Sequence, residues 1–270
     1  MTRVADIVHF LEMFAPPALA EEWDNVGLIV GDAEREVSAV MTCLTLSGDV
    51  ADEAAEKGAQ LVVSHHPLLF QPVQKITAES EEGRVLLRLI EAGISVYSPH
   101  TAYDSAAAGI NQQLAETLGL TGIDVLIPKS PTPDGDKLSG LRLGSGRFGE
   151  LAKPLPLGRF VELVKQKLSV SHVQYVGDLS SPVNRIGIAC GSAAEFMHAA
   201  REKGCDALLT GEARFHACIE ARSLGMALIL AGHYATERPG VERLATILAD
   251  EFPALRVWAS QREADPIHWA

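Results

Sequence analysis

The chain has 270 residues, of which 47% are hydrophobic, and its formal net charge is −12 at pH 7. This length and apolar content predict a globular protein with one large domain or two of ordinary size. The acidic balance, without any cluster of Lys and Arg, argues against nucleic acid as a partner. The four cysteines have neither zinc-knuckle nor disulfide-framework spacing, and no apolar run reaches the length of a membrane span, so we expect a cytoplasmic protein with no membrane partner.

The first half of the chain predicts alternating helices and strands. Apolar residues at helical spacing predict an amphipathic helix over Val4–Phe14, which Pro16 and Pro17 end. Residues 22–28 have turn chemistry. Further strands are expected over 37–46, 61–64 and 94–97, and further helices over 49–57, 82–91 and 106–118. Such alternation is typical of α/β architecture, with sheets flanked by helices.

The second half repeats this alternation after a segment of different composition. Pro and Gly punctuate the middle of the chain, which predicts a connection rather than a core element. A helix over 160–168 follows, then strands and helices up to residue 232, a turn over 233–240 and a helix over 241–251. We therefore expect a first α/β lobe over 1–127, a Pro/Gly-rich connection over 128–158 and a second lobe over 159–232, with 233–270 packing near the first lobe.

Two matches between the halves indicate an internal repeat. Residues 38–58 align with 184–204 at an offset of 146, and Leu-Val-Val-Ser at 61–64 then meets Ala-Leu-Leu-Thr at 207–210. Helix ends shared by any two α/β units would explain this first match equally well. At an offset of 133, however, His100-x-x-x-Asp104 meets His233-x-x-x-Glu237 at the next strand end. This recurrence favours two related α/β lobes.

Metal-binding side chains follow three of the expected strands: His65, His66, His100, Asp104, His233 and Glu237. Imidazole and carboxylate together suit borderline divalent ions such as Zn, Fe, Mn, Co or Ni. Neighbours in an extended segment point in opposite directions, so His65 and His66 would serve two different ions. A bridging carboxylate would leave each ion about three protein ligands and an open position, as catalytic sites require.

Each of these residues also has a structural alternative, which for His65 and His66 is one hydrogen-bonded core imidazole and one loop residue. Asp104 can cap the helix that follows it, and His100 can brace a turn after Pro99. His233 and Glu237 can form a simple surface pair on a helix.

Glu212 and His216 form one more pair four residues apart after a strand. They are candidates for orienting a ligand or transferring a proton. An ordinary pair on a helix face is the alternative.

Five motifs, in order along nearly the whole chain, resemble the Nif-three-like family, whose members are often labelled GTP cyclohydrolase I type 2 homologues. The motifs are Trp23-Asp24-Asn25-Val26-Gly27-Leu28, Ser64-His65-His66-Pro67-Leu68-Leu69-Phe70, His100-Thr101-x-x-Asp104, Thr210-Gly211-Glu212 and Gly232-His233-Tyr234-x-x-Glu237-Arg238. The resemblance implies a two-lobed α/β protein that forms a toroidal homohexamer, with two divalent metal ions in each subunit. The connection is too short for an inserted domain, so the chain is similar to the minimal form of the family.

The resemblance also implies which residues bind metal. The ligands are His65, His66, Asp104, His233 and Glu237, with Glu237 as the bridge, while His100 lies close by without ligating. Two motifs depart from the family pattern. Leu44-Thr45-Leu46-Ser47 replaces Leu-Asp-x-Thr, and Ala102-Tyr103 replaces Asn-Leu before Asp104. These changes spare the ligands and affect substrate contacts.

The function expected from this site is a dinuclear metal-dependent hydrolase that acts on a nucleotide or related small anionic compound through a metal-bound hydroxide. GTP cyclohydrolase-like ring opening is implied by the resemblance alone. His100, Glu212 and His216 are the candidates for proton transfer. The alternative is a non-catalytic hexameric metal-binding scaffold or protein-interaction platform.

Overall fold

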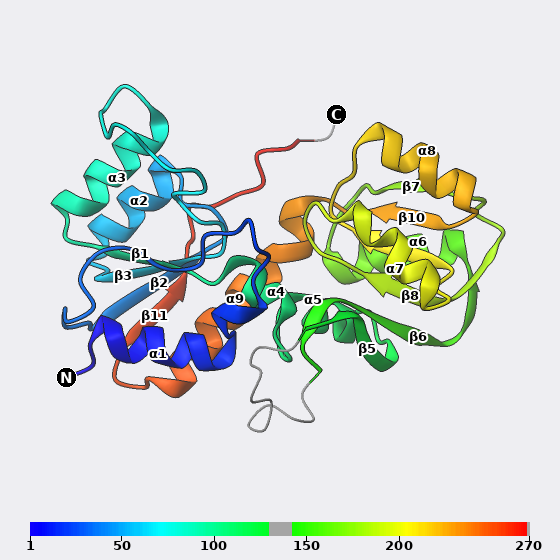
Figure 1. Cartoon of the computed structure of the whole chain (residues 1–270), viewed down its shortest axis with the longest axis horizontal. Helices are drawn as coiled ribbons and strands as arrows, with labels where there is room; N and C mark the ends of the chain where they lie inside the picture. Colours follow the sequence, from blue (N-terminus) through cyan, green and yellow to red (C-terminus); the bar gives the residue numbers. More distant parts are fainter. Residues whose placement is uncertain (130–141, 269–270) are drawn as a thin grey trace. The chain divides into compact units, whose positions relative to one another are not determined.

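A computed structural model describes residues 1–129 and 142–268 of the chain (Figure 1). The chain forms two compact units. The first contains residues 1–103 and 238–266, and the second contains residues 104–237 with the chain end from Ile267. Among the described residues, every helix is too short or too polar to cross a membrane.

The first unit is built on a five-stranded sheet in the order β1-β4-β3-β2-β11. The strands are β1 (Gly27–Val30), β2 (Ala39–Cys43), β3 (Leu61–Ser64), β4 (Ser95–Ser98) and β11 (Arg256–Ala259). β11, β2, β3 and β4 run parallel, and β1 pairs antiparallel with β4. Because β3 and β4 are parallel neighbours, the segments that leave their carboxyl ends start at the same edge of the sheet.

Helices cover both faces of this sheet (Figure 1). α2 (Gly48–Glu56) and α3 (Glu81–Glu91) pack on one face, where Met41, Val62 and Val96 of the strands are fully buried. α1 (Val4–Phe14) and residues 238–251 of α9 (His233–Glu251) lie on the other face. The predicted amphipathic first helix is confirmed as α1, which ends ahead of Pro16 and Pro17, because the apolar spacing that predicted it is the spacing that buries it.

The second unit is built on a six-stranded sheet in the order β5-β6-β8-β9-β10-β7. The strands are β5 (Thr121–Pro128), β6 (Gly144–Pro156), β7 (Gln174–Val176), β8 (Pro182–Ile188), β9 (Ala207–Thr210) and β10 (Ala227–Leu230). β8, β9 and β10 run parallel, while β5, β6 and β7 pair antiparallel with their neighbours. The orders β4-β3-β2 and β10-β9-β8 match, and β3 and β9 lie at the offset that the repeat predicts.

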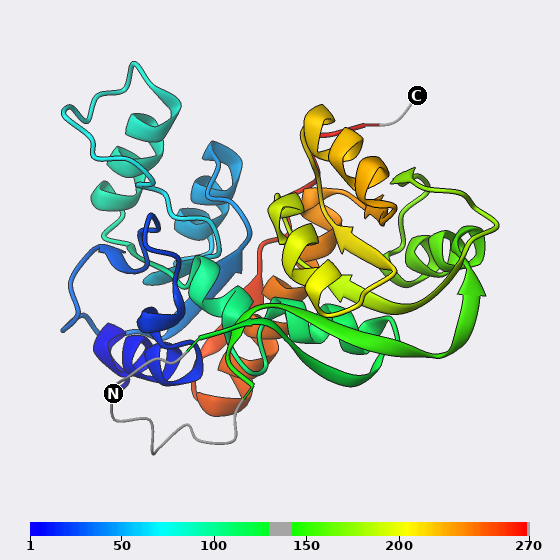
Figure 2. The same cartoon turned by 45° about the vertical axis from the view of Figure 1, so that its right-hand side comes forward.

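Helices also cover the second sheet (Figure 2). η2 (Ala194–Phe196), α7 (Met197–Glu202) and α8 (Phe215–Leu224) share a core cluster with Leu208 and Leu228 of the strands. α6 (Leu157–Leu168) contributes the fully buried Phe160 and contacts β6 and β8, and α5 (Ile110–Thr117) contacts β5, β6 and β8. The predicted α/β class, with two sheets flanked by helices, is confirmed.

The divisions of the chain differ from the predicted ones. Within the predicted connection over 128–158, β6 pairs with both β5 and β8. Its glycines are required by close packing, because a Cβ at Gly144 would lie 2.2 Å from the carbonyl oxygen of Ile127. Its prolines lie beyond Glu150, where the pairing with β8 becomes irregular. The composition therefore resembles a linker although the segment is part of a sheet; residues 130–141 of the predicted connection lie outside the described residues.

Two predicted helix boundaries also differ. The helix expected over 106–118 is observed as α5, which begins at Ile110 after Gly109, and a separate short helix, α4 (His100–Ser105), precedes it. The turn expected over 233–240 was wrong, because α9 begins at His233 and continues through Pro239. A proline there removes only the hydrogen bond to the carbonyl of Ala235, and burial of the helix further on stabilises it against that loss.

Candidate metal centre

Three histidines gather at the edge of the first sheet. His65 and His66 follow β3, and His100 begins α4 directly after β4. One ring nitrogen from each lies within 4.8 Å of the others. The ring centroids are 5.2 Å apart for His65 and His66, 5.3 Å for His65 and His100, and 5.5 Å for His66 and His100. The convergence of these two strand ends, which the sequence predicts, is therefore present in this unit.

The backbone holds the two adjacent histidines against β2. The N–H of His65 donates to the carbonyl of Cys43 at 2.9 Å, and the N–H of His66 donates to that of Leu44 at 2.8 Å. β3 ends at Ser64, so His65 and His66 form a bend rather than an extended pair. The two ring centroids lie 5.2 Å apart, and the assignment of the two rings to two different ions stays a prediction.

Asp24 fixes the third histidine. Its carboxylate accepts hydrogen bonds from His100 Nδ1 at 2.7 Å, from the backbone N–H of Thr101 at 3.1 Å and from the Thr101 hydroxyl at 2.5 Å. Burial favours the neutral acid, but these hydrogen bonds from His100 and Thr101 outweigh burial and lower the pKa of Asp24 to about 2. A carboxylate at Nδ1 leaves Nε2 of His100 for a ligand or a proton.

The sequence placed Asp24 only in a turn. Its partner His100 has φ of +24°, a conformation that L residues adopt rarely, and the hydrogen bonds to Asp24 hold it there. The signal available in the sequence was the acid in the motif Trp23-Asp24-Asn25. Its partner, far along the chain, could not be read from it.

In the second unit, the first turns of α9 carry two of the predicted ligands. His233 Nε2 lies 3.0 Å from Glu237 Oε2, and His233 Nδ1 lies 3.1 Å from Glu212 Oε1. Burial lowers the pKa of His233, but the hydrogen bonds to Glu237 and Glu212 outweigh it and raise the pKa to about 9. The imidazole is therefore protonated near neutral pH in the metal-free protein, and a metal ion at Nε2 would have to displace that proton.

Asp104 lies beside a buried thiol in the same unit. Cys190 Sγ donates to Asp104 Oδ1 at 3.3 Å. Burial, together with the negative charges of Asp104 and Glu237, raises the pKa of Cys190 far above its usual range, so the thiol stays protonated. The side chain of Asn111 links the backbones of these two residues, because it accepts from the N–H of Cys190 at 2.8 Å and donates to the carbonyl of Asp104 at 3.2 Å. Sequence spacing gave no reason to single out Cys190.

Two glycines leave room around the acidic ligands. Gly191 has φ of +65°, and a Cβ at this position would lie 2.1 Å from Glu237 Oε1 and 3.2 Å from His233 Nε2. A Cβ at Gly211 would lie 2.8 Å from the Cα of His233. Only glycine fits at these two positions. Nothing in the sequence marks Gly191, because close approach of a backbone to a side chain leaves no periodic signal.

The last predicted residue, His216, is exposed on α8 with its ring edge-on to Phe215 at 6.0 Å. Among the described residues it joins none of the groups of three candidate ligand atoms. Its role in proton transfer stays a prediction, whereas Glu212 lies against His233.

The residues present fit a divalent metal ion. Within the first unit three imidazoles supply nitrogen donors. Within the second unit His233 supplies a nitrogen donor, and Asp104 and Glu237 supply carboxylate oxygens beside a backbone that leaves space for them. Such mixed sets suit borderline transition metals and zinc. The chain thus contains His and Glu clusters that can bind metal.

Comparison with known proteins shows the family to which the chain belongs. A family model described as Duf34/NIF3 (NGG1p interacting factor 3) matches residues 2–266. A protein of Clostridium acetobutylicum named GTP cyclohydrolase 1 type 2 homolog is 35% identical over 239 residues, covering 88% of this chain and 87% of that protein. A protein of the same name from Streptomyces coelicolor is 33% identical over 98% of this chain and 94% of its own length. The crystal structure of Staphylococcus aureus protein SA1388 has a TM-score of 0.89 at 28% identity and covers 99% of each chain. This chain therefore belongs to the Duf34/NIF3 family.

Proposed function

We propose that this protein is a dinuclear metal-dependent hydrolase that acts on a nucleotide or a related small anionic compound. The proposed ligands are His65, His66, Asp104, His233 and Glu237, with Glu237 as the bridge between two divalent ions. The observation that carries the proposal is the group of three imidazoles whose ring nitrogens lie within 4.8 Å of one another. The names of the relatives support a GTP cyclohydrolase-like reaction.

Two bound divalent ions, whether Zn, Fe, Mn, Co or Ni, would lower the pKa of a shared water and polarise the substrate. The protein's own contribution to proton transfer is the Asp24–His100 pair. Asp24 holds a proton on Nδ1 of His100, so Nε2 can accept a proton from the attacking water and return it to the leaving group. The buried carboxylate stabilises the imidazolium that forms in between. Glu212 orients His233 in a comparable way.

Two exposed aromatic rings beside His100 favour a substrate with a planar ring. Trp23 is 60% exposed and Phe70 is 44% exposed, and their ring centroids are 5.7 Å apart. Each also lies near the His100 ring, at 6.1 Å and 6.4 Å. The neighbours of Trp23 hold it in place, since Asp24 binds α4 and the Asn25 amide donates to the carbonyl of Leu69. Exposed aromatic rings on an anchored loop suit stacking with a nucleobase.

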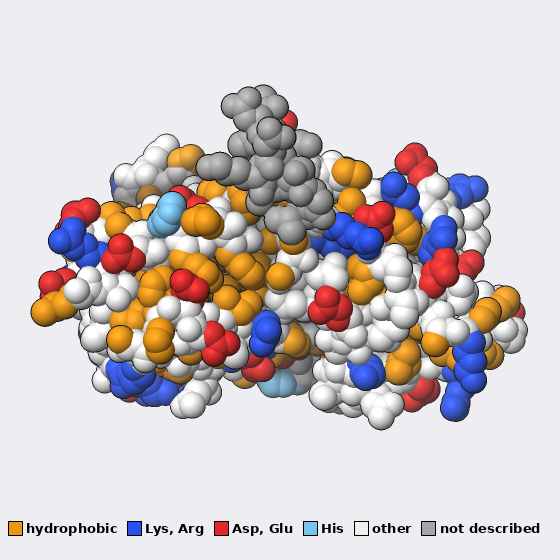
Figure 3. All heavy atoms as spheres, turned by 90° about the horizontal axis from the view of Figure 1, so that it is seen from below, with side chains coloured by type: hydrophobic (Ala, Val, Ile, Leu, Met, Phe, Trp, Pro, Cys, Tyr) orange, Lys and Arg blue, Asp and Glu red, His pale blue; other side chains and the backbone are white. Residues whose placement is uncertain are grey.

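The proposed substrate is small rather than polymeric. On the face in Figure 3, Lys and Arg side chains are scattered among Asp and Glu and form no continuous basic stripe. The net charge of −12 would repel a nucleic acid backbone. We also propose the homohexamer that the family resemblance implies, which a mass measurement in solution would test.

The test of the enzymatic proposal combines metal analysis with a substrate panel. The protein is purified without added metal, its metal content is measured, and nucleotides and phosphoesters are screened for metal-dependent turnover. We expect about two ions per chain and turnover that Glu237→Ala abolishes. Glu242→Ala, an exposed acid on the same helix, is the matched control and should keep both. A full metal complement with no turnover across the panel would instead favour the non-catalytic scaffold.

A further inference from the structure

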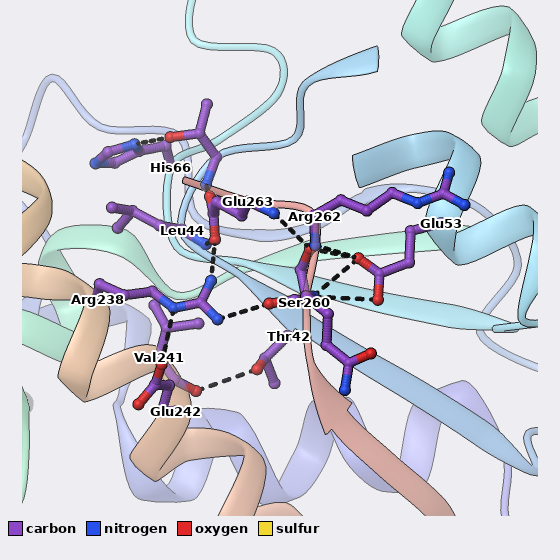
Figure 4. Close-up of polar contacts among 12 residues, drawn as sticks. Thr42, Leu44, Glu53, His66, Arg238, Val241, Glu242, Ser260, Arg262 and Glu263 are labelled. Carbon is purple, nitrogen blue, oxygen red and sulfur yellow. Dashed lines mark hydrogen bonds and ion pairs between the residues drawn. The ribbon is translucent and has the colours of Figure 1, made fainter. Parts of the chain in front are cut away.

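Glu53 anchors the chain segment that follows β11 within the first unit (Figure 4). The side chain of Glu53 is fully buried. Its carboxylate accepts hydrogen bonds from the Ser260 hydroxyl at 2.7 Å and from the backbone N–H groups of Gln261 and Arg262 at 3.0 Å each. A charged, buried acceptor with this many donors holds a segment firmly. Residues 260–263 therefore have a fixed position against α2.

Glu263, at the end of this anchored segment, binds the backbone that follows β2. Its carboxylate accepts from the N–H of Leu44 at 2.8 Å and from the N–H of Thr45 at 2.5 Å. It also pairs with Arg238, the residue after Glu237 in α9. Only 6% of the Glu263 side chain is exposed, so water screens these interactions little.

The segment that Glu263 holds contacts His66 directly. The Thr45 hydroxyl lies 2.7 Å from Nδ1 of His66, and the carbonyl of Leu44 accepts from the N–H of His66 at 2.8 Å. With Nδ1 engaged by Thr45, a metal ion would bind His66 through Nε2. A hydrogen bond at Nδ1 also sets the rotation of the ring.

We propose that Glu263 and Thr45 are positioning residues that orient His66 for metal binding, and that metal binding is coupled to the docking of residues 260–263. The inference rests on the assignment of His66 as a ligand under the proposed function. Coupling of this kind is reciprocal: if the docked segment strengthens metal binding, bound metal stabilises the docked segment by the same factor.

The first test is metal affinity, measured by competition with a chromophoric chelator using Zn²⁺. Thr45→Val keeps the shape of the side chain but removes the hydroxyl, so we expect affinity about 10-fold weaker, whereas Thr45→Ser should remain near wild type. Glu263→Gln should weaken Zn²⁺ binding by a comparable factor, and the double variant Thr45→Val/Glu263→Gln should lose little more, because both act on His66. The matched control is Glu242→Gln, which removes the negative charge of another partner of Arg238 without touching Leu44 or Thr45.

The second test measures hydrogen exchange in the docked segment, residues 260–263. Hydrogen exchange at the amides of Gln261 and Arg262, which Glu53 binds, should slow when Zn²⁺ is added to wild type and should respond much less in Thr45→Val. Normal Zn²⁺ affinity in folded Thr45→Val, or fully additive losses of affinity in the double variant, would overturn the proposal that Glu263 and Thr45 orient His66. Should Glu263→Gln fail to fold, the pair of Thr45 variants and the exchange measurement still decide.

The same variants, measured together with His66→Ala, distinguish a failure of this inference from a failure of the proposed function. If His66→Ala binds Zn²⁺ as tightly as wild type, the assignment of His66 as a ligand fails, and the positioning role of Thr45 and Glu263 fails with it. If His66→Ala weakens binding while the Thr45 and Glu263 variants do not, only the positioning role is wrong.

Discussion

The two units share a strand arrangement but carry different chemistry at equivalent strand ends. The parallel strands β4-β3-β2 in one correspond to β10-β9-β8 in the other. After β3 come His65 and His66, whereas Gly211 and Glu212 follow β9. At this strand end one unit thus presents two imidazoles and the other a carboxylate, although the second unit also supplies the imidazole of His233 from α9. The repeated fold therefore fixes where the donor side chains lie, while a few substitutions at strand ends decide which donors are offered.

The two units also hold their candidate ligands in different ways. In the first, side chains support the histidines, as Asp24 supports His100 and Thr45 supports His66. In the second, bare backbone approaches the ligands, as Gly191 does at Glu237. The first arrangement should therefore weaken gradually when a hydrogen bond is removed, and the second should fail abruptly when an atom is added.

The largest effect is expected for Gly191→Ala. The new Cβ would lie 2.1 Å from Glu237 Oε1, so Glu237 or the backbone must move, and we expect metal affinity to fall by about 100-fold or more. Gly225→Ala is the matched control, because Gly225 also has a left-handed φ, of +68°, but has no atom within 4 Å of the added Cβ. Both variants carry a backbone penalty of about 1 kcal/mol, which thermal unfolding would measure. Equal metal affinity in the two variants would show that the close approach of Gly191 to Glu237 does not matter for metal binding.

A somewhat smaller effect is expected when the support of His100 is removed. Asp24→Asn leaves the shape of the side chain but removes the charge that stabilises an imidazolium at His100. We expect kcat to fall by about 100-fold while metal content stays near wild type, since neither residue is a proposed ligand. The measurement is turnover on the substrate found in the nucleotide panel, with metal analysis of the same sample. Loss of metal without a separate loss of kcat would assign His100 to ligation instead.

Acid should destabilise the first unit before the second. Among the described residues, Asp24 and Glu53 of the first unit are the carboxyl groups whose pKa is lowered to about 2, from 3.8 and 4.5. A lowered pKa contributes stability above the unfolded value, and this contribution disappears as pH falls through the folded value. The loss, about 2 kcal/mol for Asp24 and about 3 kcal/mol for Glu53, is expected between about pH 4.5 and pH 2.

Tryptophan fluorescence of a Trp269→Phe variant can follow this transition, because the other two of the three tryptophans, Trp23 and Trp258, lie in the first unit. We expect it to change at a higher pH than the circular dichroism of the whole chain. Glu53→Gln should lower the stability at pH 7 and flatten its dependence on pH in this range. A single transition seen equally by both probes, unchanged in Glu53→Gln, would contradict the difference between the units.

The sequence predicted the parts of the fold and site that depend on local patterns. Apolar periodicity located α1, and a β-branched run bounded by Pro67 located β3 with the histidines that follow it. The ends of parallel neighbours meet, so the approach of His100 to His65 and His66 followed from the order of elements. Composition failed where the same residues serve two purposes: glycines needed for close packing made β6 resemble a linker, and Pro239 with Gly240 made the start of α9 resemble a turn.

The parts that escaped prediction are supporting contacts between distant segments. Glu263 is 219 residues from Leu44, and Asp24 is 76 residues from His100. The sequence around each acid looks like the sequence around an ordinary exposed acid. Only the folded chain brings each acid close to the groups that donate hydrogen bonds to it. A ligand is recognisable by its side-chain type, but the residue that orients it is recognisable only by its position in space.

The smallest effect is expected at the exposed aromatic pair, and it distinguishes the two units once more. Trp23→Ala should raise KM about 10-fold for a substrate with a planar ring, because one stacking contact is worth about 1 to 3 kcal/mol. Phe215 of the second unit is even more exposed, at 74%, and Phe215→Ala is the control that should leave KM unchanged. Trp23→Phe should restore most of the affinity, since it keeps an aromatic face beside His100. If Trp23→Ala leaves KM unchanged and instead alters the mass of the protein in solution, Trp23 belongs to a subunit contact rather than to the substrate site.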